Sequence, residues 1–263
     1  MPRPVTLITG ASAGIGAALA HMFAAKGHEV ALLARRALQL AQLADAIESA
    51  GGKRPHILAI DLARADASTR IDDEMHGRDL EPQYVVNNAG FGLLGPAAEL
   101  DRSEQLAMID LNVRILTDLS LRFVDSLAHQ RGGILNVASV ASFMPGPGMA
   151  VYHATKAYVL SFSEALHHEL APRGVRVTAL CPGPVATEFQ SRAGIPESYF
   201  PRFLARTAER VAREGYDGLM RGKRVIVPGT ENKVATFLPR LLPRAWVLKY
   251  LVAGVRERPK SDK

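Results

Sequence analysis

The sequence predicts an α/β fold in which a doubly wound parallel sheet of about seven strands is covered by helices on both faces. Short, mostly apolar runs recur along the chain, and segments with the spacing of amphipathic helices separate them. The runs do not alternate with polar residues, which is typical of strands that are buried on both faces. Parallel strands need helical crossovers, and the alternation of the two patterns provides them.

Seven apolar runs are the expected strands, and helical patterns lie between most of them. The strands are Pro4–Thr9, Glu29–Ala34, His56–Ile60, Gln83–Asn87, Gly133–Ala138, Val175–Leu180 and Val225–Val227. The helices are Ile15–Lys26, Leu38–Ala50, Ala65–Met75, Arg102–His129 and Tyr152–Ala171. Ligands of such sheets bind at the carboxyl ends of the strands, so the turns after the strands are the expected site.

The composition is that of a globular protein. With 263 residues, 48% of them hydrophobic and 22% charged, the chain can form one α/β domain and is neither disordered nor collagen-like. We expect this domain to span residues 1–230, with residues 231–263 as a C-terminal extension. The single cysteine, Cys181, excludes an internal disulfide and favours a reducing compartment such as the cytoplasm. We expect no signal peptide and no transmembrane span, because no long uncharged apolar window exists.

The net charge of +6 is not spread evenly along the chain. Residues 1–200 contain 17 basic and 20 acidic side chains, whereas residues 201–263 contain 15 basic and 6 acidic ones. A nucleic-acid binder is suggested only by the overall basic balance, and the slightly acidic first two hundred residues speak against it. We therefore expect no nucleic-acid partner.

The first strand is followed by a glycine-rich loop that opens directly into a helix. The loop residues that we expect to contact a cofactor are Gly10, Ser12, Ala13, Gly14, Ile15 and Gly16. Glycines let the backbone approach a pyrophosphate, and the free N–H groups at the helix N-terminus bind it. Any turn from strand to helix favours glycine, so the loop alone is weak evidence, and the strands on either side strengthen it.

The turn after the second strand indicates which dinucleotide is bound. A carboxylate there would bind the ribose hydroxyl of NAD, but this chain has Arg35 and Arg36 instead. Guanidinium groups bind phosphate through paired donors, so we expect NADP(H), bound by both arginines. The alternative is that both arginines are simply solvated at the end of a strand.

Polar residues also come after the third and fourth strands. Asp61, beside Leu62, can accept hydrogen bonds from an adenine amino group. The run from Asn87 through Asn88 and Ala89 to Gly90 can either line the cofactor or tie neighbouring strands together. A plain turn is a further alternative for that run.

Tyr152 and Lys156 are four residues apart in an expected helix, which places them on one face. A phenol titrates near pH 10, and a neighbouring ammonium group favours its ionised form, so the pair can move a proton near neutral pH. Ser139 ends the fifth strand and can donate a hydrogen bond to a substrate carbonyl. Asn112 lies inside an expected helix, where asparagine is unfavourable and a functional reason is plausible.

Together these motifs resemble the short-chain dehydrogenase/reductase family, in order and spacing, from residue 5 to about residue 190. The resemblance implies a Rossmann-type fold that interconverts a carbonyl and an alcohol with a nicotinamide cofactor. It implies that Tyr152 transfers the proton, that Lys156 lowers the pKa of Tyr152 and holds the nicotinamide ribose, that Ser139 positions the oxygen, and that Asn112 supports a proton relay. It also implies four further cofactor contacts: Pro182, Gly183, Val185 and Thr187. Ala13 departs from those members that carry a basic residue at this position to bind NADP.

Other sites are weaker. His167 and His168 are adjacent, so their side chains diverge on a helix, and we expect no metal site. Cys181 is more typical of a small buried residue than of a nucleophile. A hydrolase is not expected, because no Gly-x-Ser-x-Gly motif is present.

The expected substrate is a lipophilic ketone or alcohol, such as a steroid or a fatty-acyl compound. Aromatic and methionine side chains lie near the predicted site and in a predicted lid over residues 187–221. Ordinary core packing is an equally good explanation for these side chains. The candidate substrate contacts are Phe91, Phe143, Met144, Met149, Phe189 and Phe200, with Tyr199 and Phe203 as further members of the same set.

The C-terminal extension mixes arginines with large apolar residues, including Phe237, Leu241 and Trp246. Such a segment can pack on its own domain, on a second subunit, or on an anionic membrane surface as a peripheral contact. The resemblance implies a homodimer or homotetramer formed through Arg102–His129 and Tyr152–Ala171. A catalytically idle NADP-binding sensor or scaffold is the alternative function; it would have no need of the Tyr152 and Lys156 pair.

Overall fold

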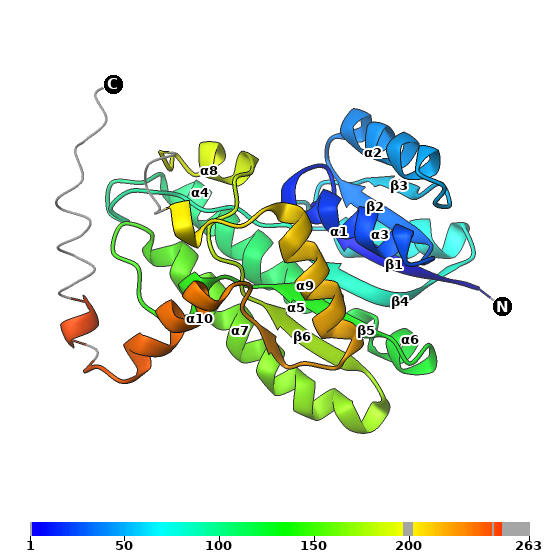
Figure 1. Cartoon of the computed structure of the whole chain (residues 1–263). Helices are drawn as coiled ribbons and strands as arrows, with labels where there is room; N and C mark the ends of the chain where they lie inside the picture. Colours follow the sequence, from blue (N-terminus) through cyan, green and yellow to red (C-terminus); the bar gives the residue numbers. More distant parts are fainter. Residues whose placement is uncertain (1, 197–201, 244, 249–263) are drawn as a thin grey trace.

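The computed structural model describes residues 2–196, 202–243 and 245–248, and it confirms the predicted fold class (Figure 1). Seven parallel strands form one sheet in the order β3-β2-β1-β4-β5-β6-β7. The strands are β1 (Arg3–Thr9), β2 (Val30–Ala34), β3 (His56–Ala59), β4 (Leu80–Asn87), β5 (Gly133–Val137), β6 (Arg176–Leu180) and β7 (Val225–Ile226). The strand order reverses between β1 and β4, which opens a crevice at the carboxyl ends of these two strands.

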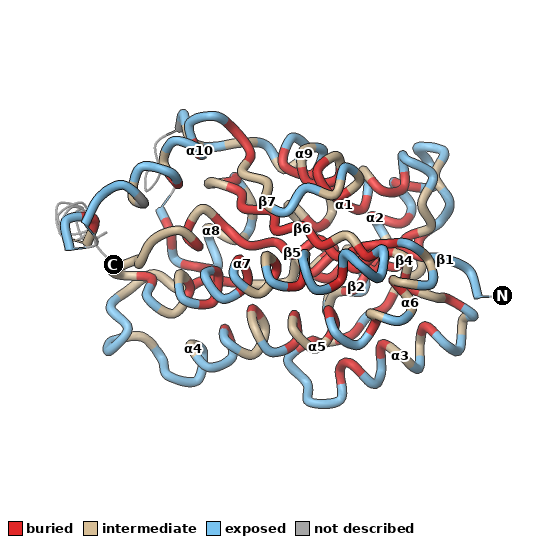
Figure 2. The backbone as a smooth tube through the Cα atoms, turned by 90° about the horizontal axis from the view of Figure 1, so that it is seen from below, coloured by how far each residue is buried: buried red, intermediate tan, exposed pale blue. Residues whose placement is uncertain are grey.

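Helices cover both faces of the sheet, and each face has its own buried core. The main helices are α1 (Gly14–Ala25), α2 (Ala37–Ser49), α3 (Ala67–Gly77), α5 (Ile115–Arg122), α6 (Val124–His129), α7 (Ala150–Leu170) and α9 (Ala208–Met220). Successive residues of β1 point to opposite faces: Ile8 packs with α1, α2 and α9, and Leu7 packs with α3, α5, α6 and α7. Figure 2 shows that the central strands of the sheet are buried. Leu7 and Ile8 are both fully buried. Because helices cover both faces of the sheet, apolar and polar residues do not alternate along the strands.

The predicted helix Arg102–His129 is wrong as a single element. The chain forms α4 (Arg102–Ile109), a π-helical turn over Asp110–Arg114, then α5 and α6. A π turn inserts one extra residue into a helix, and Asn112, the middle residue of this turn, is fully buried. Hydrophobic periodicity still predicts a helix through such a turn, so the turn could not be found from the sequence.

The predicted lid over 187–221 is too long. Within the described residues of this range, Thr187, the short helix α8 (Glu188–Arg192) and Ile195 line the crevice. Helix α9 instead buries Val211 and Leu219 in the core shared with α1. Residues 197–201 fall outside the described part of the chain.

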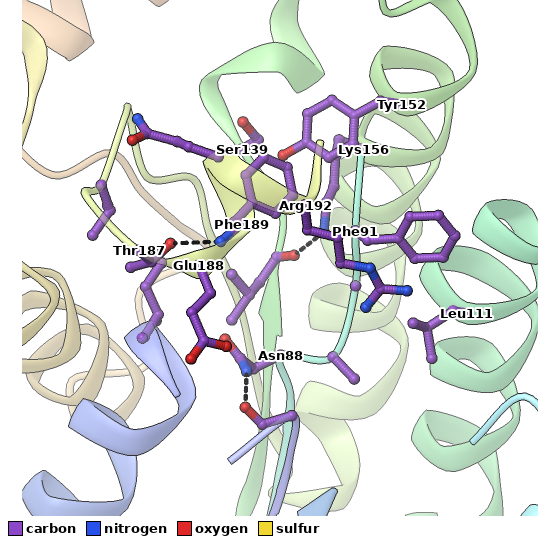
Figure 3. A pocket seen from close by; sticks show the side chains of 18 of the residues that line it. Asn88, Phe91, Leu111, Ser139, Tyr152, Lys156, Thr187, Glu188, Phe189 and Arg192 are labelled. Atoms are coloured by element: carbon purple, nitrogen blue, oxygen red, sulfur yellow. Dashed lines mark hydrogen bonds between the residues drawn. The ribbon is translucent and has the colours of Figure 1, made fainter. Parts of the chain in front are cut away.

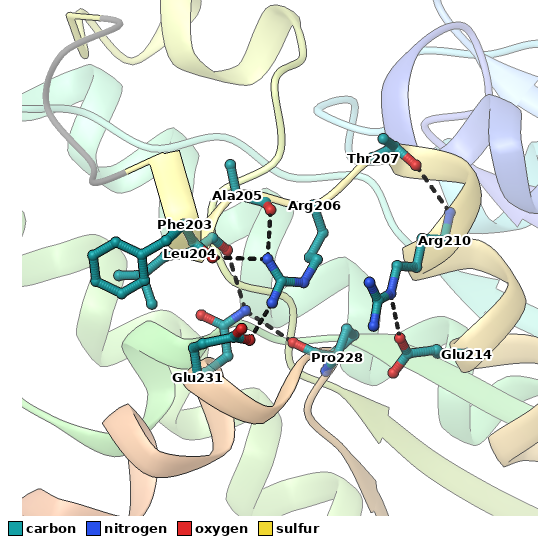
Figure 4. A network of polar contacts seen from close by, with 10 residues as sticks. Phe203, Leu204, Ala205, Arg206, Thr207, Arg210, Glu214, Pro228 and Glu231 are labelled. Carbon is teal, nitrogen blue, oxygen red and sulfur yellow. Dashed lines mark hydrogen bonds and ion pairs between the residues drawn. The ribbon is translucent and has the colours of Figure 1, made fainter.

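The expected boundary at residue 230 is also displaced, because helix α10 (Thr230–Phe237) is anchored to the domain. The buried Asn232 amide donates to the carbonyl oxygens of Pro228 at 2.8 Å and Leu204 at 3.3 Å. The Arg206 guanidinium donates to the Phe203 carbonyl oxygen and pairs with Glu231 (Figure 4). The extension therefore begins as part of the fold. No helix in the described residues is long and apolar enough to cross a membrane.

Candidate active site

A cavity of about 1090 Å³ lies at the carboxyl ends of the strands, where the strand order reverses. Figure 3 shows that side chains from the β4 and β5 ends, from α7 and from α8 meet around it. Most residues predicted from the sequence line it: Gly10, Ser12, Ala13, Gly14, Ile15, Arg35, Arg36, Asp61, Leu62, Asn88, Ala89, Gly90, Phe91, Ser139, Met144, Met149, Tyr152, Lys156, Pro182, Gly183, Val185, Thr187 and Phe189. The predicted catalytic, dinucleotide and substrate residues thus share one site.

Some predicted residues do not line this cavity. Gly16 and Asn112 lie behind its wall, and Phe143 lines a second, mostly apolar cavity on the other side of the loop that contains Met144. Phe203 is exposed to solvent. Tyr199 and Phe200 lie outside the described residues. Phe143 and Phe203 thus do not face the position where the substrate was expected, since proximity in sequence to Ser139 or to the lid does not fix the direction of a side chain.

The glycine loop has the backbone conformation that its glycines were expected to allow. Gly10 and Gly14 have positive φ values of +64° and +57°, which side chains with a Cβ rarely adopt. A Cβ on Gly16 would lie 2.3 Å from the Gly10 carbonyl oxygen, so Gly16 is needed for packing rather than for contact with a ligand. The Asn88 amide donates to the Thr9 carbonyl oxygen at 2.9 Å and ties the loop to β4. The cradle left by these glycines fits a pyrophosphate at the α1 N-terminus.

The two arginines after β2 behave differently. Arg36 donates to the Ser12 hydroxyl at 3.0 Å and forms an ion pair with Glu188 at 2.8 Å, which links the glycine loop to α8. Arg35 lines the cavity and, within the described residues, has no ion pair. Asp61, two residues after the end of β3, accepts a hydrogen bond from the Ala63 N–H at 3.0 Å.

Tyr152 and Lys156 are both buried on the face of α7 that borders the cavity. Burial raises the pKa of Tyr152 to about 12, and a hydrogen bond with the Ser139 hydroxyl opposes this rise. Burial lowers the pKa of Lys156 to about 8, with Cys181 acting weakly in the other direction. The Lys156 ammonium lies 5.9 Å from the centre of the Tyr152 ring. Desolvation is the largest cause, so the pKa of Tyr152 is raised rather than lowered as the neighbouring Lys156 led us to expect.

The positions of these side chains are set by local hydrogen bonds. Ser139 caps the 3-10 turn Val140–Phe143 by accepting the Ala141 N–H at 3.1 Å. Lys156 donates to the Val137 carbonyl oxygen at 2.8 Å, so its ammonium group is held beneath the end of β5. The Ser142 hydroxyl donates to the Lys156 carbonyl oxygen at 2.7 Å, which joins the turn to α7.

Asn112 acts on the site through its neighbours. Its amide donates to the Phe91 carbonyl oxygen at 2.9 Å and to the Thr155 hydroxyl at 3.1 Å, and its carbonyl oxygen accepts the Phe91 N–H at 3.1 Å. A fully buried side chain with three such bonds holds the segment after Gly90 against α7. Asn112 lies in the middle of the π turn.

Several cavity residues were missed in the sequence. Apolar Leu93 and Ile195 pack with Phe91, Met149 and Tyr152 in a small core beside the cavity. The polar ones are Glu104, His153, Glu188, Gln190 and Arg192. The His153 Nδ1 atom lies 2.8 Å from the Met144 carbonyl oxygen, and burial lowers its pKa. Apart from Glu104, their only sequence signal was closeness to Tyr152 or to the predicted lid. Among the described residues, no group of His, Cys, Asp and Glu could hold a metal ion.

Comparison with known proteins identifies the family of this chain. The family model for short chain dehydrogenase matches residues 4–197. Sulfoacetaldehyde reductase 2 of Chromohalobacter salexigens is 36% identical over 188 residues, which cover 70% of this chain and 74% of that protein. The structure of a short-chain dehydrogenase from Sphingobium yanoikuyae in complex with NADPH has a TM-score of 0.80 and 30% identity, covering 99% of this chain and 98% of that one. A 3-ketoacyl-(acyl-carrier-protein) reductase from Brucella melitensis complexed with NADH has a TM-score of 0.75 and 26% identity, covering 85% and 95%.

The matched region runs from β1 to α8 and so includes the whole cavity-forming part of the sheet up to β6. The named proteins are dehydrogenases and reductases, and both NADPH and NADH occur among the solved structures. The chain is therefore an oxidoreductase that acts on CH–OH groups or the corresponding carbonyls with a nicotinamide cofactor. It belongs to the short-chain dehydrogenase/reductase family.

Proposed function

We propose that this protein is an NADP(H)-dependent reductase or dehydrogenase that interconverts a carbonyl and an alcohol by hydride transfer on a substrate with a lipophilic body. One observation carries the proposal: Ser139, Tyr152 and Lys156 border the same cavity as the glycine loop and Arg35. A single ligand-sized space therefore joins proton-transfer groups to a phosphate cradle.

The chain's own residues supply the proton and the orientation of the substrate. With a pKa of about 12, Tyr152 keeps its proton at neutral pH and can donate it to a carbonyl oxygen, while the Ser139 hydroxyl donates a hydrogen bond to the same oxygen. When bound, a nicotinamide supplies the hydride in reduction and takes it in oxidation. The charged form of Lys156 favours the phenolate that remains after proton donation. Asn112 positions this centre through Phe91 and Thr155.

Arg35 supports the preference for NADP(H). Its guanidinium lines the cavity just after β2, where a carboxylate would select NAD, and within the described residues it has no carboxylate partner. A ribose phosphate offers the anionic group that it lacks. The NADPH-bound relative is consistent with this preference, and the NADH-bound one marks NAD as the cofactor to test against it.

The apolar wall of the cavity supports a lipophilic substrate. Phe91, Met149 and Phe189 lie beside Tyr152 in one buried cluster, and the Phe189 ring lies 5.4 Å from the Tyr152 ring. Such a wall suits a steroid, fatty-acyl or similar ketone. A short anionic aldehyde, like that of the sulfoacetaldehyde reductases, is the second candidate, because Arg192 also lines the cavity.

We also propose that the protein is a homodimer or homotetramer in the cytoplasm. Helices α4, α5 and α7 expose four large apolar side chains, Leu106, Ile109, Leu121 and Tyr158, which a subunit interface through these helices would cover. An idle sensor or scaffold is the rival function. The buried Tyr152 and Lys156 pair and the reductase relatives argue against it, since a sensor needs no proton-transfer groups.

A carbonyl panel with NADPH and NADH tests the proposal. We expect wild-type protein to oxidise NADPH faster than NADH with at least one ketone or aldehyde, and the Tyr152→Phe variant to lose at least about a thousandfold in kcat while binding NADPH as before. Tyr158→Phe is the matched control, because that phenol is exposed on the same helix. Unchanged turnover in Tyr152→Phe would sink the catalytic assignment, and tight NADPH binding without turnover of any carbonyl would favour the sensor.

A further inference from the structure

One cation of the cavity has no task in the proposed reaction. Arg36 is paired with Glu188, Arg35 is assigned to the cofactor, and Lys156 is held by the Val137 carbonyl oxygen. Arg192, the last residue of α8, remains. In the described part of the chain, its guanidinium forms no hydrogen bond or ion pair with a carboxylate, and its close partner is an aromatic ring.

The position of Arg192 is fixed by the way α8 is attached. The Thr187 hydroxyl caps the helix by accepting the Phe189 N–H at 3.4 Å, and Glu188 binds Arg36 across the crevice. These contacts hold the first residues of α8 against the glycine loop. The helix is short, so its last residue is held on the cavity side as well (Figure 3).

The guanidinium of Arg192 lies over the Phe91 ring, 4.3 Å from the ring centre. Phe91 is buried and is itself fixed by both backbone hydrogen bonds to Asn112. A guanidinium on an aromatic face is oriented while its N–H donors stay free at the edges. The cavity wall therefore presents a set of directed donors that nothing in the described chain occupies.

The electrostatic surroundings of Arg192 are mixed. Partial burial, and next the charge of Arg35, lower the pKa of Arg192, whereas Glu104 and Asp61 act in the opposite direction. Both carboxylates line the cavity, but neither forms an ion pair with Arg192. A solvated arginine needs no partner. Arg192 differs from a solvated arginine because it lies on the cavity wall over the buried Phe91 ring, and because the charge of a second guanidinium, that of Arg35, lowers its pKa.

We propose that Arg192 binds an anionic group of the ligand held in this cavity, namely a carboxylate, a sulfonate or a phosphate. The group belongs either to one end of the carbonyl substrate or to the cofactor. The inference rests on the proposed function, because that function puts both ligands into this cavity. An anionic end is compatible with the apolar wall, since a substrate can have an apolar body and a charged terminus.

The test compares Arg192→Gln, Arg192→Lys and the wild type, with Arg213→Gln as the control for loss of one exposed positive charge on α9. Levulinate and its methyl ester form a matched pair of ketones with and without a negative charge. For each protein, kcat/KM is measured on both ketones with NADPH, and Kd for NADPH is measured by fluorescence titration without turnover. Glutamine keeps much of the bulk and removes the charge, and lysine keeps the charge but not the paired donors.

A loss of about ten- to hundredfold in Arg192→Gln is expected in one of the two measurements. A loss confined to levulinate assigns the anion to the substrate, and a raised Kd for NADPH assigns it to the cofactor. Arg192→Lys restores part of either loss, and Arg213→Gln resembles the wild type. The inference is overturned if Arg192→Gln binds NADPH like the wild type and also has the wild-type ratio of kcat/KM for levulinate to kcat/KM for its methyl ester. A wild type that reduces no carbonyl at all contradicts the proposed function instead, and the NADPH titration then still reports on Arg192.

Discussion

At the scale of single residues, the centre of the site combines two ionisable groups that burial drives toward their neutral forms. The pKa of Tyr152 rises to about 12 and the pKa of Lys156 falls to about 8. The protein thus holds a protonated phenol ready for donation and an ammonium group that is costly to bury. Lys156 is 5% exposed, and within the described residues its ammonium group donates one hydrogen bond, to the Val137 carbonyl oxygen.

The cost of burying the Lys156 ammonium group makes the free energy of unfolding depend on pH. The unfolded chain keeps the Lys156 proton up to about pH 10.5, whereas the folded chain releases it near pH 8. Between these values the unfolded state binds more protons, so raising the pH stabilises the folded state relative to the unfolded one. The penalty is present in full below about pH 8 and amounts to roughly 3 kcal/mol.

We therefore expect Lys156→Met to be stabilised relative to the wild type at neutral pH, and this difference to shrink as the pH rises toward 10. Urea unfolding of both proteins at several pH values measures it. Lys26→Met, at an exposed lysine, is the control and should show no such trend. A difference between wild type and Lys156→Met that is constant over this range would contradict the depressed pKa.

Residue types and spacing predicted the polar centre well, because chemistry restricts Ser139, Tyr152 and Lys156 to positions that a motif can specify. Side-chain direction was less predictable. Phe143 comes soon after Ser139 in sequence but faces the second cavity, because the 3-10 turn rotates it away. Arg192 could not be foreseen, since its place depends on where α8 lies over Phe91.

At the scale of elements, the link between α8 and the glycine loop is the feature that the sequence could not supply. Glu188 and Arg36 are far apart in the chain and meet because the fold brings α8 next to the turn after β2. The same limit applies to the π turn at Asp110–Arg114: the apolar spacing predicted a helix, and only packing around Asn112 decides where the extra residue is inserted.

Glu188 pairs with Arg36, which is next in the chain to Arg35, the arginine that we assign to the cofactor phosphate. Both members of the Glu188 and Arg36 pair are solvent-exposed, so we expect Glu188→Gln to change the free energy of unfolding by less than about 1 kcal/mol. Its main effect should be on binding: Kd for NADPH should fall about three- to tenfold because repulsion of the phosphate is removed, while Kd for NADH changes little. Fluorescence titration of both cofactors measures this, with the exposed Glu169→Gln as control. Weaker NADPH binding in Glu188→Gln would mean instead that the ion pair is needed to hold α8 in place.

At the scale of the whole molecule, the uneven charge found in the sequence coincides with an exposed apolar surface. Residues 233–263 contain eight basic and two acidic side chains, and their surplus equals the net charge of the whole chain, +6. In the described part of this segment, Val234, Phe237, Leu238, Leu241, Leu242 and Trp246 are each between 43% and 67% exposed. Figure 2 shows the same contrast between α10 and the buried sheet. The sequence predicted a basic apolar extension, but not that its start is anchored through Asn232 while its apolar side chains point outward.

This segment combines basic residues in its sequence with exposed large apolar residues and a tryptophan, a combination that is complementary to an anionic lipid interface. We expect the full-length protein to co-sediment with vesicles of phosphatidylcholine and phosphatidylglycerol, to bind pure phosphatidylcholine weakly, and to be released by salt, because each basic residue near the surface contributes about 1 kcal/mol. The double variant Leu241→Ser/Trp246→Ser should lose about tenfold or more in vesicle binding, whereas Leu38→Ser, at an equally exposed leucine on α2, should not. Light scattering of the same proteins examines the competing occupant: if the double variant changes the oligomeric state and the wild type ignores anionic vesicles, this surface joins subunits rather than contacting a membrane.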